Sequence, residues 1–241
     1  MVSPLGMQPL ERDAYLERYG HDWRTPERVH EYVERVDREI DQRAEGLAVL
    51  VALIPFERDQ ALRVLDVGTG PGLVASRLLD AFPAARAVGL DVSEPMRDVA
   101  RERMAGYGER FSFVLADFVE GDLPPEAHGP FDVVVSSRAI HHVPAKAKRR
   151  LYRAIYAALG PGGCFFNLDS VAPADDGLRP VFGAASARLA GHPPELSAGR
   201  LPGHYYDTVE DHLQFLRDAG FGLVGCFWQR LGLALVGGYR A

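Results

Sequence analysis

The sequence predicts an α/β fold in which a mostly parallel sheet is covered by helices on both faces. Predicted strands and helices alternate between residues 62 and 170, which is the pattern of consecutive β-α-β units. The strands are nearly continuous apolar runs, as strands buried on both faces require. A glycine-rich turn follows the first strand and opens a helix. The length of 241 residues suits one large domain of this class.

Two helices are predicted before the alternating region. Residues 26–43 place valines, a tyrosine and an isoleucine on one stripe at helical spacing, with Thr25 as the N-cap and Pro26 at the first helical position. A second helix is expected over residues 45–54, which end at a proline. Together with the residues before them, these helices are expected to form an N-terminal cap over residues 1–58.

The alternating region is predicted from apolar runs, helical spacing and intervening turn residues. Its strands are expected at 62–68, 85–93, 110–118, 131–137 and 162–170, and its helices at 72–82, 94–105 and 146–159. Sequential strands joined by helices lie parallel to one another, so their carboxyl ends meet at one edge of the sheet.

The alternation of strands and helices stops over residues 172–206, a segment that contains five glycines and five prolines. One short helix is expected near 181–190, and the segment as a whole is predicted to be an insertion that acts as a lid or binding element. The regular pattern resumes over residues 207–241. An amphipathic helix is predicted over 208–220, and two strands follow it as an antiparallel hairpin.

Composition narrows the class of protein. With 47% hydrophobic and 25% charged residues, the chain has the composition of a globular domain. A net charge of −6 argues against strong non-specific binding to nucleic acid. The start of the chain lacks a basic stretch followed by an apolar block, so a cytoplasmic location is expected. Cys164 and Cys226 lie in apolar segments and are expected to be buried free thiols.

The stretch "VLDVGTGPG" over residues 64–72 carries the most functional information. Gly68, Gly70 and Gly72 follow a strand and precede a helix, so backbone N–H groups can approach a ligand closely at the helix N-terminus. Asp91 ends the next strand, 19 residues after Gly72. A carboxylate at that position suits the two hydroxyls of a ribose.

Two features distinguish this turn from a dinucleotide-binding turn. The pattern G-x-G-x-x-G would require a glycine or alanine where Leu73 stands. Asp66 also lies two residues before the first glycine, where its charge would disfavour a pyrophosphate but suit an ammonium group.

The ordered motifs "VLDVGTGPG", "GLDVSEPM", "LADF", "FDVVVSSRAIHHV" and "LGPGGCFFNLD" resemble those of the class I S-adenosylmethionine-dependent methyltransferases. The resemblance covers roughly residues 60–170, and the helix and hairpin after residue 207 resemble the family's C-terminal part. It implies a single Rossmann-like domain over residues 1–241. Its doubly wound sheet would have seven strands, six parallel and the last antiparallel, with S-adenosyl-L-methionine bound at their carboxyl ends.

The resemblance also implies roles for individual residues. Asp66 would receive the methionyl ammonium, Asp91 the ribose hydroxyls and Asp117 the adenine amino group. The residues implied at the donor site are Asp66, Gly68, Thr69, Gly70, Gly72, Asp91, Val92, Met96, Asp117, Phe118, Ser136 and Arg138. For Met96 a role in the helix core, and for Asp117 a place on the surface, remain open alternatives.

Two adjacent histidines, His141 and His142, follow the fourth predicted strand. Histidine can remove a proton near neutral pH, so His141 is the candidate catalytic base, with a structural or cofactor-adjacent role as the alternative. No metal site is expected, because adjacent residues on a helix diverge by about 100° and no further ligands cluster nearby in the sequence.

Other residues are candidates for contacts with the acceptor, each with packing as the alternative. They come from the aromatic N-terminal segment, the ends of the fourth and fifth strands, and the end of the insertion: Tyr15, Tyr19, Trp23, His142, Asp169, His204 and Tyr205. The prediction is a methyltransferase that acts on a small molecule, with homodimerisation possible.

Three alternative functions remain open at this stage. One is a tRNA wobble-uridine-modifying enzyme that uses an S-adenosylmethionine-type cofactor. The others are an NAD-dependent oxidoreductase and a non-catalytic cofactor-binding protein. The basic run from Lys146 to Arg153 would serve an RNA-docking face, but it is expected to be the solvated side of a helix instead.

Overall fold

The computed structural model describes residues 11–38, 40–190 and 203–241 and contains a seven-stranded sheet in the order β3-β2-β1-β4-β5-β7-β6. Strands β1 to β5 are parallel where they pair, and β7 is antiparallel to both β5 and β6. The predicted arrangement of six parallel strands and one antiparallel strand is therefore confirmed. The strands are β1 (Arg63–Val67), β2 (Arg86–Asp91), β3 (Phe111–Leu115), β4 (Phe131–Ser137), β5 (Leu159–Ser170), β6 (Gly222–Arg230) and β7 (Leu233–Tyr239).

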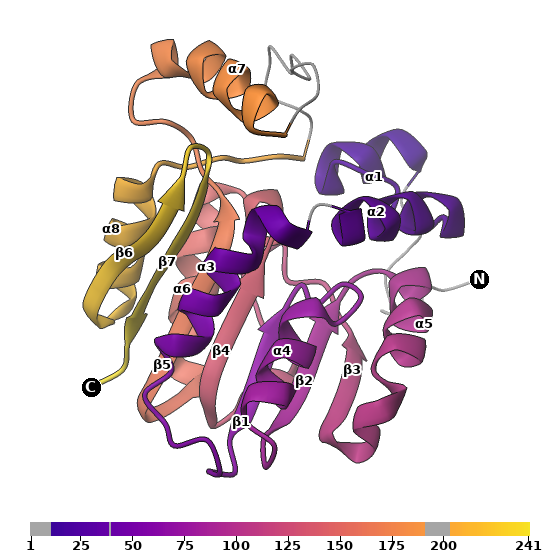
Figure 1. Cartoon of the computed structure of the whole chain (residues 1–241), viewed down its shortest axis with the longest axis vertical. Helices are drawn as coiled ribbons and strands as arrows, with labels where there is room; N and C mark the ends of the chain where they lie inside the picture. The colour runs from indigo at the N-terminus through magenta and orange to yellow at the C-terminus, as the bar shows by residue number, and fades with distance from the viewer. Residues whose placement is uncertain (1–10, 39, 191–202) are drawn as a thin grey trace.

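Helices cover both faces of this sheet (Figure 1). Side chains of α3 and α4 share one apolar core with one face of the strands, and side chains of α6 and α8 share the other core. The α-helices are α1 (Arg12–Tyr19), α2 (Pro26–Arg38), α3 (Ile40–Ala52), α4 (Leu73–Ala81), α5 (Glu94–Arg103), α6 (Ala145–Ala158), α7 (Arg179–Ala190) and α8 (Val209–Ala219). Short 3₁₀ helices are η1 (Ala105–Arg110), η2 (Pro125–Ala127), η3 (Ile140–His142) and η4 (Asp176–Leu178).

The predicted boundary between the two N-terminal helices lies inside α3. The expected break near residue 44 is wrong, because α3 runs without interruption from Ile40 to Ala52. Val29 and Val33 of α2 pack on Met96 of α5, whereas Leu50 of α3 packs in the core that contains α4. The apolar sides of α2 and α3 therefore pack on different parts of the molecule.

Helix α8 begins and ends at the capping residues that the sequence predicts. Thr208 caps α8 with a reciprocal capping box, in which its hydroxyl accepts from the Asp211 N–H at 3.1 Å and the Asp211 carboxylate accepts from the Thr208 N–H at 3.0 Å. Gly220 ends the helix with φ of 107°. Figure 1 shows α7 beyond the carboxyl end of β5, while residues 191–202 lie outside the described residues.

Two expectations about burial are wrong. Cys164 is buried as expected, but Cys226 is exposed, because β6 is the edge strand of the sheet. Lys148 does not lie on the solvated side of α6, since its side chain is fully buried. Its ammonium donates to the Asp207 carboxylate and to the Tyr205 carbonyl, which offsets the cost of burying the charge. Lys148 therefore ties α6 to the end of the insertion.

No helix among the described residues is both long enough and apolar enough to cross a membrane.

Candidate active site

A pocket of about 580 Å³ lies at the carboxyl ends of β1, β2 and β4, the edge where ligands bind in open α/β sheets. The N-terminal helices contribute to it as well as the strand ends. Its lining residues are Tyr19, Trp23, Tyr32, Gly68, Gly70, Asp91, Val92, Met96, Asp117, Phe118, Val119, Arg138, Ala139 and His142. The pocket brings together eight of the twelve predicted donor-site residues, Arg138 among them, and three predicted acceptor contacts, Tyr19, Trp23 and His142.

The glycine turn brings backbone donors to one wall of the pocket. Gly68 has φ of 71°, and a Cβ on it would overlap Ala139, so only glycine fits there. Gly70 has φ of 53°, and its N–H donates to the Asp91 carboxylate at 2.9 Å. The other oxygen of Asp91 accepts from the Ser93 N–H at 3.0 Å. Burial raises the pKa of Asp91, and these two N–H donors oppose that rise.

Asp66 lies beneath the turn rather than in the pocket lining, and one of its oxygens has no partner. Its Oδ2 accepts from the Thr69 hydroxyl at 2.9 Å and from the Ala75 N–H at 3.2 Å. Its Oδ1 is buried without a hydrogen bond. Burial raises the pKa of Asp66 to about 7, an increase that the Thr69 and Ala75 donors only partly offset. An unpartnered buried carboxylate oxygen next to a glycine turn fits a ligand that carries an ammonium group.

The apolar end of the pocket lies on β2, α5 and the segment after β3. Val92, Met96 and Phe118 line it, so one flat apolar ligand group can be enclosed there. Met96 is also part of a small core with α2, so it belongs both to that core and to the pocket wall. Asp117 lines the pocket and is not a free surface residue.

Helix α1 closes this end by contacts with Asp117. The Tyr19 hydroxyl donates to the Asp117 carboxylate at 2.7 Å, and the Arg18 guanidinium donates to the same oxygen at 2.9 Å. The other Asp117 oxygen accepts from the Val119 N–H at 2.9 Å. Tyr15 does not line the pocket, because its ring is buried against Tyr19 with the ring centroids 4.4 Å apart.

Three other predicted donor-site residues support the pocket without lining it. The Ser136 hydroxyl donates to the Val67 carbonyl at 2.7 Å, which joins β4 to β1. Thr69 orients Asp66, and Gly72 caps α4 in the left-handed region, where a Cβ would lie 2.7 Å from the Met104 sulfur. The pocket is also lined by Tyr32, Val119 and Ala139, which carry no signal in the sequence that marks them as site residues. Tyr32 was assigned only to a helical stripe, because periodicity does not show which end of a helix meets a site.

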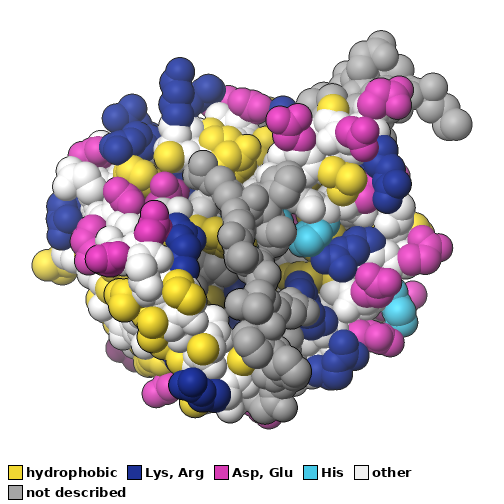
Figure 2. All heavy atoms as spheres, turned by 90° about the horizontal axis from the view of Figure 1, so that it is seen from above, with side chains coloured by type: hydrophobic (Ala, Val, Ile, Leu, Met, Phe, Trp, Pro, Cys, Tyr) yellow, Lys and Arg dark blue, Asp and Glu magenta, His cyan; other side chains and the backbone are white. Residues whose placement is uncertain are grey.

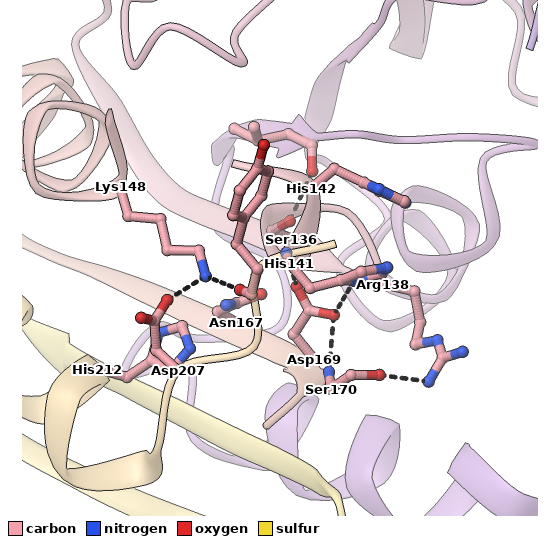
Figure 3. A network of polar contacts seen from close by, with 12 residues as sticks. Ser136, Arg138, His141, His142, Lys148, Asn167, Asp169, Ser170, Asp207 and His212 are labelled. Carbon is pink, nitrogen blue, oxygen red and sulfur yellow. Dashed lines mark hydrogen bonds and ion pairs between the residues drawn. The ribbon is translucent and has the colours of Figure 1, made fainter. Parts of the chain in front are cut away.

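Beyond the pocket lies a histidine pair that two strand ends hold in place. His141 is buried in η3, and its Nδ1 lies 2.7 Å from an Asp169 oxygen at the end of β5 (Figure 3). The other Asp169 oxygen accepts from the His141 N–H at 2.9 Å. Burial opposes ionisation of Asp169, but His141 and Arg138 outweigh it and hold the pKa of that carboxyl well below its usual range. Asp169 therefore fixes both the backbone and the ring of His141.

His142 faces the pocket, and His204 joins the pair from the end of the insertion. The Nδ1 of His142 lies 2.8 Å from the Gly203 carbonyl, and the ring centroids of His142 and His204 are 4.5 Å apart. Burial lowers the pKa of His142 well below 6.5. One ring nitrogen from each of His141, His142 and His204 lies within 4.8 Å of the others. The third histidine is 62 residues from the second, so sequence proximity could not reveal this histidine cluster (His141, His142 and His204).

The segment after Gly203 is fixed against η3. The Tyr205 N–H donates to the His141 carbonyl at 2.6 Å, and the Tyr206 ring stacks on the His141 ring with centroids 5.7 Å apart. Tyr205 therefore contacts His141 through its backbone, and the ring beside His141 is that of Tyr206. The contact of Tyr205 with an acceptor stays a prediction. His21, from the segment after α1, lies with its ring centroid 5.2 Å from that of His204.

Arg138 connects the pocket to a second cavity. It has φ of 58°, and its guanidinium donates to the Ser170 hydroxyl at 2.7 Å. It lines the first pocket and also a cavity of about 680 Å³ between α7 and the turn that joins β6 to β7. Arg230 lines the same cavity. Two guanidinium groups there suit an acidic ligand group.

Two of the exposed basic residues of α6 are paired with acids. Arg149 contacts Asp218 at 2.7 Å, and Arg150 contacts Asp122 at 2.5 Å. Seen from the carboxyl ends of the strands, basic and acidic side chains are interspersed among the coloured residues (Figure 2). The described part of this face therefore shows no continuous basic surface of the kind that tracks a nucleic-acid backbone.

Comparison with known proteins places this architecture among methyltransferases. Residues 64–163 match the family model described as a methyltransferase domain. The trans-aconitate 2-methyltransferase of Variovorax paradoxus is 35% identical over 123 residues, which are 51% of this chain and 43% of that protein. The malonyl-[acyl-carrier protein] O-methyltransferase of Legionella pneumophila is 31% identical over 140 residues, or 56% of this chain and 43% of that protein. The chain thus spans less than half the length of these two relatives.

Solved structures share the fold over a larger part of the chain. The S-adenosylmethionine-dependent methyltransferase SibL, in its apo form, has 27% identity and a TM-score of 0.61, covering 83% of this chain and 55% of that one. The structure of PigF with S-adenosylhomocysteine has 21% identity and a TM-score of 0.67, covering 94% of this chain and 67% of that one. The second likeness is one of fold alone.

Proposed function

The chain belongs to the class I S-adenosylmethionine-dependent methyltransferases, and from this premise we propose that it transfers a methyl group to a small-molecule acceptor with His141 as the base. When bound, S-adenosylmethionine supplies a methyl group that is already activated by its sulfonium. The protein must then position the acceptor, exclude water and remove a proton where the acceptor carries one.

The residues present fit such a donor. The unpartnered Asp66 Oδ1 would accept from the ammonium of the methionyl part. Asp91 would accept from the ribose hydroxyls with lone pairs that its two N–H donors leave open. Val92, Met96 and Phe118 would enclose the adenine, and Asp117 would accept from its amino group. Tyr19 and Trp23 would then cover the donor from the N-terminal side.

The observation that carries the proposal is the buried contact between His141 and Asp169. Asp169 lies 2.7 Å from Nδ1, so it holds a proton on that nitrogen and leaves Nε2 to take one from the acceptor. It also stabilises the imidazolium that forms, as a carboxylate does when it orients a catalytic histidine. His142, the next residue, lines the donor pocket, so the base lies beside the donor site. This arrangement favours an acceptor that loses a proton from oxygen or nitrogen.

The wobble-uridine alternative finds less support. The exposed arginines Arg149 and Arg150 are paired with acids, and Lys148 is buried. The relatives described above are named for trans-aconitate and malonyl-[acyl-carrier protein], which supports an acceptor that carries an acidic group. Arg138, which lines the pocket, would bind a carboxylate of such an acceptor.

Transfer of labelled methyl from S-adenosylmethionine tests the proposal. The acceptor panel holds phenols, hydroxy acids, amines, tricarboxylic acids including trans-aconitate, and bulk tRNA. We expect transfer to a small acceptor and none to tRNA. Transfer to tRNA alone would contradict the proposal, and donor binding without transfer to any acceptor would indicate a non-catalytic protein. Binding of NAD in preference to S-adenosylhomocysteine would indicate an oxidoreductase.

A further inference from the structure

We propose that His141, His142 and His204 bind one divalent transition-metal ion, with Zn²⁺ as the reference ion. Three neutral imidazoles and an open fourth position form a typical donor set for zinc. The three residues come from η3 and from the end of the insertion, and one ring nitrogen of each lies within 4.8 Å of the other two.

The contacts behind two of the rings are those of a metal site. Metal-bound histidines almost always donate their other ring N–H to a carboxylate or a backbone carbonyl. His141 has Asp169 at 2.7 Å from Nδ1, and His142 has the Gly203 carbonyl at 2.8 Å from Nδ1. Both contacts set the same tautomer, with the proton on Nδ1 and the lone pair on Nε2. The hydrogen bonds therefore prepare both Nε2 atoms as ligands.

The size of the cluster suits a small ion after modest adjustment. Zinc–nitrogen distances of about 2.0–2.1 Å place tetrahedral ligand nitrogens roughly 3.4 Å apart. The three nitrogens lie within 4.8 Å of one another, so binding of the ion would have to draw them closer together. His141 and His204 are buried, and the charge of Asp169 lies directly behind His141, where it would stabilise a cation.

Metal binding would also bear on the proposed function, and this part of the inference rests on it. The Nε2 of His141 cannot hold a metal ion and accept a proton at the same time. An occupied cluster would therefore mask the base while leaving the donor pocket intact. Zn²⁺ should then stop proton-dependent methyl transfer, and chelation should restore it. A requirement for Zn²⁺ in transfer would contradict this masking.

The binding claim is tested on the full chain without an affinity tag, after treatment with a chelator and desalting. ZnCl₂ is titrated by calorimetry, bound zinc per chain is measured by mass spectrometry, and CoCl₂ is used to record the visible spectrum. We expect one ion per chain and a tetrahedral cobalt spectrum. His204→Ala should weaken binding by at least about 100-fold, because it removes a direct ligand, and loss of an outer-shell partner alone typically costs about 10–100-fold. His30→Ala, at an exposed histidine of α2, should change nothing.

A second measurement separates a failed metal site from a misfolded variant. S-adenosylhomocysteine is titrated into the same proteins, because His204 does not line the donor pocket. Unchanged donor affinity with lost zinc in His204→Ala supports the inference. Equal zinc binding by the wild type, His204→Ala and the double variant His142→Ala/His204→Ala would overturn it, as would the absence of stoichiometric zinc in the wild type.

Discussion

The donor pocket and the histidine cluster lie side by side but are built in different ways. The donor pocket takes its glycine turn and Asp91 from one local unit, in which β1, the turn, α4 and β2 follow one another along the chain. The histidine cluster takes His141 and His142 from η3 and His204 from a segment 62 residues later, with Asp169 of β5 behind them. A locally built site depends mainly on backbone geometry, whereas an assembled one depends on long-range contacts that hold separate segments together. Substitutions should therefore separate donor binding from turnover.

The largest expected effect is on turnover. His141→Ala should lower the rate of methyl transfer by about 10²–10⁴-fold, the range for loss of a general base, and leave the affinity for S-adenosylhomocysteine unchanged. Asp169→Asn should also lower the rate of methyl transfer, because His141 would lose the partner that fixes its tautomer. Steady-state kinetics and calorimetry measure the two quantities separately. An unchanged turnover number in His141→Ala would show that the acceptor, a carboxylate for example, needs no base.

The next largest effect is expected on stability, at the contact between α6 and the end of the insertion. Asp207→Asn should destabilise the fold by about 3 kcal/mol, because it leaves a buried ammonium without its carboxylate. Lys148→Met should cost less, since the Lys148 side chain is fully buried whereas that of Asp207 is 16% exposed and can reach water. Denaturant unfolding gives both free energies. If Lys148→Met were the more harmful of the two, the burial of the ammonium would not be the dominant cost.

In the donor pocket, Asp91→Ala should weaken the binding of S-adenosylhomocysteine by roughly 50-fold. This corresponds to the loss of about 2–3 kcal/mol from hydrogen bonds to a charged acceptor. Asp91→Asn, which keeps one acceptor oxygen, should lie between this variant and the wild type. Calorimetric titration measures both, and the zinc affinity of the histidine cluster serves as the control because it should not change. Loss of zinc binding in Asp91→Ala would show that the two sites are not separately built.

Donor affinity should also depend on pH through Asp66. Its folded pKa of about 7 lies above the usual value of 3.8, so the carboxyl of the unliganded protein is neutral below about pH 7. An ammonium prefers the carboxylate, so affinity should rise by up to about 10-fold per pH unit as the pH approaches 7 and level off above it. Asp66→Asn should abolish this slope in titrations across that range.

The sign of the same shift can be checked on stability without any ligand. A raised folded pKa contributes stability that is complete below the unfolded pKa and is lost as the pH rises through the folded pKa. The unliganded wild type should therefore lose stability between about pH 4 and pH 7 relative to Asp66→Asn. Thermal unfolding at both ends of this range measures the difference. A wild type that gains stability relative to Asp66→Asn over this range would contradict the raised pKa.

The smallest effect is expected on the outer face of α6. Arg150→Ala removes an exposed pair with Asp122 and should change the free energy of unfolding by less than about 0.5 kcal/mol. Methyl transfer to a small acceptor should also stay within twofold of the wild type, a rough limit for an exposed charge. A large loss of transfer in this variant would revive the interpretation of this face as a docking surface for RNA.

The contrast between a site built from neighbouring elements and one assembled from distant segments explains what the sequence could predict. The order and direction of the strands, the glycine turn and Asp91 follow from periodicity, glycine conformation and the position of an acid after a strand. The histidine cluster does not, because a strand pattern says nothing of which loop folds back onto η3. The burial of Lys148 was hidden for the same reason, since its partner Asp207 is 59 residues away in a different segment. The membership of Tyr32 in the pocket likewise depends on how α2 packs on α5.

A crystal structure of the chain with S-adenosylhomocysteine tests the central claim most directly. We predict that the ribose hydroxyls contact Asp91, that the ammonium reaches the Oδ1 of Asp66, and that the sulfur faces the side of the pocket lined by Arg138 and His142. The histidine cluster would then lie beyond the sulfur, where an acceptor can approach. A ligand bound with its sulfur turned toward Met96 and Phe118, away from the histidines, would contradict the account.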